Sequence, residues 1–171
     1  SAVIKKNIDS DCGNTYVDPT EIQQIVMNLC SNAVWAMKEK GTLKITLCQI
    51  HLNAQKAVEV GVRQGDYIEL LFSDTGQGMD SETKSRIFDP FYTRKEVGEG
   101  TGMGLSIVYS IMKSYDGGIT VESEPGKGST FHIVLPCMPV PPGEEPGPET
   151  REGIKGDWSY DELDSRANTI K

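Results

Sequence analysis

The spacing of apolar residues changes along this chain, and that change limits the folds it can adopt. Hydrophobic residues recur every three to four positions from Asp18 to about Lys40, as on one face of a helix that stops at Gly41. The same reasoning predicts a short helix over residues 81–87 and an apolar helix over residues 103–115. Strand-like alternation occupies four further segments, 42–49, 66–74, 119–124 and 129–135. The pattern predicts an α+β fold, a two-layer α/β sandwich in which a mixed sheet carries helices on one face.

The segments around the first helix are predicted from their turn and cap residues. Residues 3–9 and 15–17 are expected to form two opening strands. Asp18 can cap the helix that follows, and Glu21 can complete a capping box. Residues 50–65 show no clear period and are expected to be irregular.

Charge and cysteine content exclude several classes of protein. The chain has 171 residues, with 17 Lys and Arg against 25 Asp and Glu, and its net charge of −8 argues against binding nucleic acid or anionic lipid. No apolar run approaches the roughly 18 residues of a membrane span, and no export signal is visible, so a cytoplasmic location is expected. The four cysteines form no C-x-x-C pair and are expected to be reduced, structural thiols.

Composition also divides the chain. Residues 1–136 are predicted to form one folded domain, and residues 137–156 a linker rich in Pro, Gly and Glu that cannot build a core. Residues 157–171 form an acidic tail. Disorder, packing on a neighbouring protein and a non-native addition all stay open for this tail.

Two asparagines on the first helix are candidates for a metal site. Asn28 and Asn32 lie four residues apart, so their carboxamides leave the helix on one side. An amide oxygen can bind a hard cation such as Mg²⁺ when a nucleotide supplies the remaining ligands. The alternative is that both are ordinary surface amides.

A carboxylate at the end of a predicted strand is a candidate for binding a base. Asp74 continues the alternating series that includes Phe72, so it is expected to face the core, where a buried carboxylate needs a donor such as an exocyclic amine. Gly76 and Gly78 would let the backbone lie close to a flat ligand. A simple Asp turn is the alternative.

A glycine-rich segment, residues 98–104, leads directly into the apolar helix. Its amides and the positive helix end suit phosphate groups, although a flexible linker is the alternative. Upstream, Arg94 and Lys95 follow an aromatic segment and can approach phosphate oxygens. Ser129 is predicted to face the core, unless it only bonds the backbone of a hairpin turn.

Together these motifs resemble a known family. Five segments look, in family order, like the N, G1, F, G2 and G3 boxes of sensor histidine kinases: Asn28–Ala33, Asp74–Met79, Ile87–Phe91, Gly100–Leu105 and Gly126–Phe131. The resemblance covers about residues 3–136 and implies the Bergerat-type ATP-binding fold of the GHKL superfamily, shared with gyrase, MutL and the heat-shock chaperone ATPases.

The resemblance implies ATP and Mg²⁺ as cofactors and assigns roles residue by residue. Asn32 would hold Mg²⁺ against the phosphates with support from Asn28, Asp74 would take the adenine amine, and Lys95 would be a catalytic cation. The other residues implied to contact the nucleotide are Gly76, Gly78, Met79, Phe88, Gly100, Thr101, Gly102, Gly104, Leu105 and Ser129.

Two positions distinguish this chain within the superfamily. ATP-hydrolysing members resemble one another in carrying a Glu base four residues before the metal Asn, and here that position is Asn28. An amide cannot take a proton from water, so the domain is expected to hold ATP rather than hydrolyse it efficiently. Trp35 stands where kinases often have a cationic or amide side chain, and Arg94 or Lys95 could supply the missing phosphate contact.

The acceptor of the phosphoryl group is expected outside the chain. His51 and His132 lie on no helical hairpin and are expected to be structural or solvated. The resemblance therefore implies the ATP-binding catalytic domain of a two-component kinase, whose partners are a dimerisation domain with the acceptor histidine and a receiver domain downstream. A catalytically silent ATP-sensing or docking module is the alternative, and a serine kinase or ATPase is a third reading. Membrane attachment of the intact kinase stays open.

Overall fold

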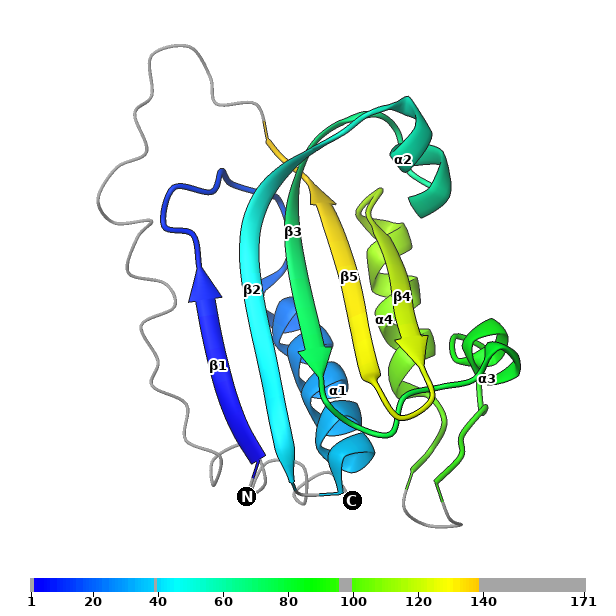
Figure 1. Ribbon diagram of the computed structural model, residues 1–171. Helices are drawn as coiled ribbons and strands as arrows, with labels where there is room; N and C mark the ends of the chain where they lie inside the picture. Colours follow the sequence, from blue (N-terminus) through cyan, green and yellow to red (C-terminus); the bar gives the residue numbers. More distant parts are fainter. Residues whose placement is uncertain (1, 39, 96–99, 139–171) are drawn as a thin grey trace. The chain divides into compact units, whose positions relative to one another are not determined.

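The fold is built on one mixed five-stranded sheet with the strand order β1-β2-β3-β5-β4 (Figure 1). The computed structural model describes residues 2–38, 40–95 and 100–138. Its strands are β1 (Ala2–Ile8), β2 (Gly41–Leu52), β3 (Gly65–Asp74), β4 (Gly118–Glu124) and β5 (Gly128–Pro136). β1 runs parallel to β2, whereas every other neighbouring pair is antiparallel. Parallel neighbours need a crossover connection, and the first helix supplies it.

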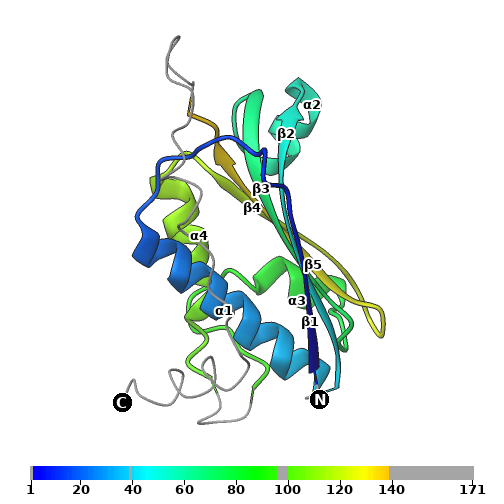
Figure 2. The ribbon, with the colours of Figure 1, turned by 90° about the vertical axis from the view of Figure 1, so that its left-hand side faces the viewer.

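Two helices cover one face of the sheet, as the apolar periods predict. They are α1 (Pro19–Met37) and α4 (Gly104–Ser114), and Figure 2 shows both on the same side of the strands. α1 begins where predicted but ends at Met37, because Lys38 adopts a left-handed conformation with a φ of 48°. The prediction of an α+β sandwich is therefore confirmed.

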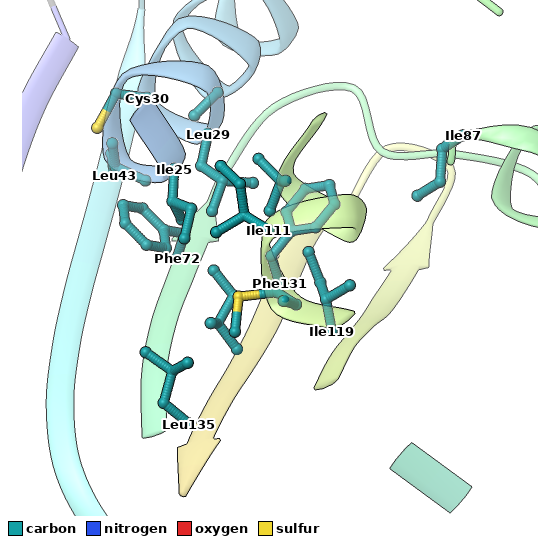
Figure 3. Close-up of a cluster of buried hydrophobic side chains, with 14 of the residues drawn as sticks. Ile25, Leu29, Cys30, Leu43, Phe72, Ile87, Ile111, Ile119, Phe131 and Leu135 are labelled. Carbon is teal, nitrogen blue, oxygen red and sulfur yellow. The ribbon is translucent and has the colours of Figure 1, made fainter. Parts of the chain in front are cut away.

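The core lies between this sheet face and the two helices. Phe72 of β3, Leu29 of α1 and Val108 of α4 are at most 1% exposed. Figure 3 shows how Phe131 and Ile111 meet in the same layer. Burying a side chain of this size contributes about 1.5–3 kcal/mol, so the layer holds the helices and the sheet in one arrangement.

Residues 50–65 are more regular than predicted. β2 continues to Leu52, and α2 (Ala54–Val60) follows, capped by the Asn53 side chain. Leu52, Ala57, Tyr67 and Val134 form a second cluster, which includes no core residue of the first. Neighbouring strand residues point to opposite faces, so α2 packs on the face opposite α1 and α4. The sequence missed it because seven residues carry too little of a helical period.

The prediction of a strand at residues 15–17 is wrong, since this segment has no strand pairing. The Asp18 cap is confirmed, because its side chain accepts a hydrogen bond of 2.7 Å from the Thr20 N–H. The predicted return contact of the capping box is replaced by Tyr115: its hydroxyl donates to Glu21 and accepts from the Asp18 N–H at 3.2 Å. This bridge ties the start of α1 to the end of α4.

The four cysteines are free thiols, as expected. None of the helices within residues 2–38, 40–95 and 100–138 combines the length and hydropathy that a membrane span needs. The division at residue 136 remains a prediction. The predicted linker and tail lie outside the described residues, apart from residues 137 and 138.

Candidate functional site

A pocket of about 120 Å³ opens at the end of the sheet where β3 ends and β5 begins, beside α1. The remaining walls come from α3 (Ser81–Arg86), from the segment 92–95 and from the start of α4. The residues that line it are Asn32, Trp35, Ala36, Asp74, Gln77, Gly78, Met79, Thr83, Ile87, Tyr92, Thr93, Arg94, Lys95, Leu105, Ser129 and Phe131.

Asp74 is a buried carboxylate on the pocket wall. Its residue is 6% exposed, and its Cα pairs in the sheet with Leu43 of β2 and with Ser129 of β5. Burial raises the pKa of the Asp74 carboxyl, and this effect outweighs the hydrogen bonds from the backbone of Gly76 and Ser129, which lower it. A carboxylate has acceptor capacity beyond these bonds, so Asp74 can accept from a donor in the pocket.

The backbone after Asp74 passes through a narrow space. The Gly76 N–H donates to Asp74 Oδ1 at 2.8 Å, and a Cβ at Gly76 would lie 2.7 Å from the backbone of Ala36. Gly78 has a φ of +65°, and a Cβ there would lie 1.9 Å from the Glu124 carbonyl oxygen. These two glycines are needed because α1 and the β4–β5 turn leave no room for a side chain.

The Met79 N–H and the hydroxyls of Ser123 and Ser129 form hydrogen bonds that hold the segment after Asp74 against β4 and β5. Ser123 Oγ accepts from the Met79 N–H at 2.9 Å and donates to the Gly128 carbonyl at 2.9 Å. Because its single hydroxyl proton is used there, the 3.0 Å bond between Ser123 and Ser129 is donated by Ser129. The predicted inward orientation of Ser129 is confirmed, since the residue is 7% exposed.

The two asparagines of α1 lie in different surroundings. Asn32 lines the pocket, whereas Asn28 does not. Asn28 Oδ1 would lie 3.3 Å from a Cβ at Gly104, so it sits against the start of α4. Its Nδ2 is buried and has no hydrogen-bond partner among the described residues. A buried amide without a partner is costly, and such a group beside a pocket is a candidate for ligand contact.

Cationic contacts hold the segment 92–95 along the pocket. Lys95 Nζ lies 5.6 Å from the ring centroid of Trp35, and Arg94 donates to Thr83 Oγ1 at 3.4 Å. The guanidinium of Arg86 lies 4.6 Å from the ring centroid of Tyr92. The segment is therefore attached to α3 through two contacts and to α1 through the Trp35 ring.

Several residues predicted from sequence lie near the pocket without lining it. Phe88 packs against the core and contacts the Tyr109 ring, with 5.7 Å between centroids. Gly102, with a φ of +67°, sits so close to Phe91 that a Cβ would lie 2.5 Å from its backbone. The other predicted residues outside the lining are Asn28, Gly76, Gly100, Thr101 and Gly104, while residues 98 and 99 lie outside the described ranges.

Other lining residues were not predicted. Thr83, Ile87 and Phe131 belong to elements that were expected, and no residue type among them signals a ligand. Ala36 lies next to Trp35 on α1 and lines the pocket through helix packing alone. Two signals could have identified some of them: Ile87 and Phe131 lie in the segments that resemble the F and G3 boxes, and the alternation of β5 places Phe131 on the face of Ser129.

Comparison with known proteins gives one consistent result. Residues 17–139 match the family described as histidine kinase-, DNA gyrase B-, and HSP90-like ATPase. Sensor kinase CckA of Brucella abortus (strain 2308) is 43% identical over 124 residues, which are 71% of this chain and 13% of that protein. Sporulation kinase E of Bacillus subtilis (strain 168) is 36% identical over 121 residues, 71% of this chain and 14% of that protein. The chain thus spans about a seventh of the length of these two relatives.

Solved structures share the fold. The nucleotide-free catalytic domain of histidine kinase ThkA has a TM-score of 0.61 at 27% identity and covers 80% of this chain and 79% of its own. Full-length ShkA in complex with AMPPNP has a TM-score of 0.63 at 24% identity, covering 81% of this chain and 26% of its own.

Replacing the buried carboxylate is expected to stabilise the empty protein. Since burial raises the pKa of Asp74, its contribution to stability is full below the unfolded value of 3.8 and is lost as the pH rises through the folded value. Asp74→Asn should therefore raise the melting temperature at pH 7, and the gain should vanish toward pH 4. Thermal unfolding without ligand over this range measures it, with the exposed Asp11→Asn as control. Equal melting temperatures of Asp74→Asn and the wild type at every pH would contradict the conclusion that burial of Asp74 raises its pKa.

Substituting two glycines, both with a left-handed backbone, distinguishes the cost of backbone strain from the cost of a steric clash. Gly126 has a φ of +78° and nothing within 4 Å of a Cβ, so Gly126→Ala should cost only the conformational strain of about 1–2 kcal/mol. Gly78→Ala should cost about 1–3 kcal/mol more, because the Glu124 carbonyl must move. Urea unfolding of both variants compares the two costs, and equal losses would show that the close approach does not exist in solution.

Proposed function

The chain belongs to the family of histidine kinase-, DNA gyrase B- and HSP90-like ATPases, as an ATP-binding catalytic domain of the sensor histidine kinase type. On this premise we propose that it binds Mg-ATP in the pocket beside Asp74 and delivers the γ-phosphate to a histidine on a dimerisation domain outside this chain. The observation that carries the proposal is the buried Asp74 carboxylate on the pocket wall.

Asp74 recognises the adenine. The exocyclic amine of the base donates to the carboxylate, which is already oriented by the Gly76 N–H at 2.8 Å. Gly78 and Met79 line the same part of the pocket and offer backbone and an apolar side chain to the ring. A guanine would place a carbonyl oxygen at the position of the amine and would repel Asp74, so the site favours adenine.

The phosphates extend toward Asn32 and the start of α4. Asn32 contributes one amide oxygen, and the described residues hold no group of three or more His, Cys, Asp or Glu side chains that could bind a metal by themselves. These residues therefore fit an ion that shares phosphate oxygens, with Asn28 as the supporting amide beside Gly104. Bound Mg²⁺ would neutralise phosphate charge during transfer.

The protein contributes orientation and charge to the transfer step. The bond from the γ-phosphorus to the bridging oxygen of ADP breaks as a bond to an imidazole nitrogen forms, and the imidazole then gives a ring proton to a base on the acceptor domain. Lys95 and the N–H groups at the start of α4 align the γ-phosphate. Asn28 cannot accept a proton as a carboxylate does, so attack by water is disfavoured.

The proposal of an acceptor outside this chain is supported by the pocket lining, which includes neither of the chain's two histidines. His51 pairs with Asp66 at 2.7 Å, and His132 pairs with Glu69 at 3.0 Å. The proposed partners are the dimerisation domain that carries the acceptor and, downstream, a receiver domain. A cytoplasmic location, where ATP is supplied, is part of the same proposal.

Nucleotide binding tests the first half of the proposal. Calorimetry with ATP and Mg²⁺ should show binding to the wild type and a loss of about 10- to 100-fold for Asp74→Asn, the worth of a hydrogen bond to a charged group. Asn32→Ala should lose the magnesium-dependent part of the affinity. Free phosphate measured in the same samples should stay near background. No ATP binding would refute the nucleotide site, and rapid phosphate release would assign the chain to the ATP-hydrolysing branch.

Phosphoryl transfer tests the second half. A dimerisation domain from a related kinase, added in trans with ATP labelled at the γ-phosphate, should become labelled. The label should be acid-labile and base-stable, as expected of phosphohistidine, and at ATP concentrations below the dissociation constant of Asp74→Asn this variant should give correspondingly less label. The matched control replaces the acceptor histidine of the added domain. Binding without any transfer would favour a silent nucleotide-sensing module.

A further inference from the structure

Trp35 lines the pocket and contacts the side chain of Lys95, and it is not part of the hydrophobic core. It lines the pocket one helical turn after Asn32, and it belongs to neither cluster of buried and packed side chains. The buried residues of α1, which face the core, are Ile25, Leu29, Cys30, Ala33 and Met37. A tryptophan that only filled the core would be expected on that stripe. Its ring instead faces Lys95, with Nζ 5.6 Å from the centroid.

Lys95 is held from more than one side. Its backbone N–H donates to Thr93 Oγ1 at 3.1 Å. Its side-chain Cδ lies only 2.7 Å from where a Cβ at Gly100 would be, so the lysine stem passes directly over that glycine. The Trp35 ring lies near the ammonium at the end of the stem, and ring and stem together limit where the charge can be.

The position of this positive charge matters because the phosphate groups of the proposed ligand are negatively charged. Asp74, the one acidic side chain among the lining residues, is assigned to the base, and the cations that line the pocket are Arg94 and Lys95. Arg94 is turned to Thr83 of α3, whereas Lys95 is turned to α1, where Asn32 lies. Of the two, Lys95 is the cation on the side where the proposed function places the phosphates.

We propose that Trp35 is a positioning residue: its ring holds the Lys95 ammonium beside the phosphates, and the pair favours nucleoside triphosphates over ligands with fewer phosphates. The inference rests on the proposed function, because it needs a nucleotide in this pocket. Trp35 carries no charge and cannot itself contact a phosphate as a cation would. Its ring instead holds the ammonium of Lys95, which supplies the positive charge.

The test compares ligands that share adenine but differ in charge. Affinities for ATP, ADP and adenosine are measured by calorimetry for the wild type, Trp35→Leu and Trp35→Phe. Trp35→Leu should lose about two- to fivefold in ATP affinity, the worth of a partly exposed cation–π contact, and should bind adenosine unchanged. Trp35→Phe keeps an aromatic face and should recover most of the loss.

A double-variant cycle shows whether Trp35 acts through Lys95. Lys95→Met should weaken ATP binding, and the added Trp35→Leu should then have no further effect. Lys113→Met is the matched control, because Lys113 Nζ lies 5.4 Å from the Tyr109 ring on α4, outside the pocket lining. It should leave all three affinities unchanged.

Fluorescence gives a signature that a purely structural role would not produce. The chain has 2 tryptophans, so Trp158→Phe leaves Trp35 as the single reporter. ATP should change its emission, adenosine should not, and Lys95→Met should abolish the response. Equal losses for all three ligands, additive single variants or an unchanged emission would overturn the proposal. Failure of the wild type to bind ATP would instead overturn the proposed function.

Discussion

The buried carboxylate of Asp74 is the constraint on which the site depends. Taking a charge out of water is unfavourable, and here backbone N–H groups of Gly76 and Ser129 offset part of that cost. The glycines that follow allow the chain to turn back beneath α1 so that one of these donors reaches the carboxylate. The domain thus keeps a destabilising group where a ligand can satisfy it, a common feature of binding sites.

The pocket also contains positively charged side chains that offset the negative charge of Asp74. The lysine and arginine of the segment 92–95 carry the positive charge, and contacts with Trp35 and Thr83 keep it near the walls. α1 joins both parts, since Ala36 packs on the turn after Asp74 while Trp35 faces Lys95. The turn after Asp74 and the Lys95 side chain, which the proposed function assigns to the base and the phosphates, are therefore linked through neighbouring residues of one helix.

Much of this could be read from local patterns. Alternation along β3 placed Asp74 inward, and alternation along β5 did the same for Ser129, because a strand has only two faces. The period of 3.6 identified α1 and α4 together with their buried stripe. The strand predicted at residues 15–17 failed, since β-prone residues form a strand only where a neighbour can pair with them.

The sequence by itself determined the order of the main elements, the inward carboxylate, the glycine positions and the family, because each depends on residues close together along the chain. Only the tertiary structure decided that Tyr115 completes the cap of α1, that α2 covers the other sheet face and that Lys95 lies over Trp35. These contacts join residues far apart in sequence, and no local spacing encodes which distant side chain will be near once the layers pack.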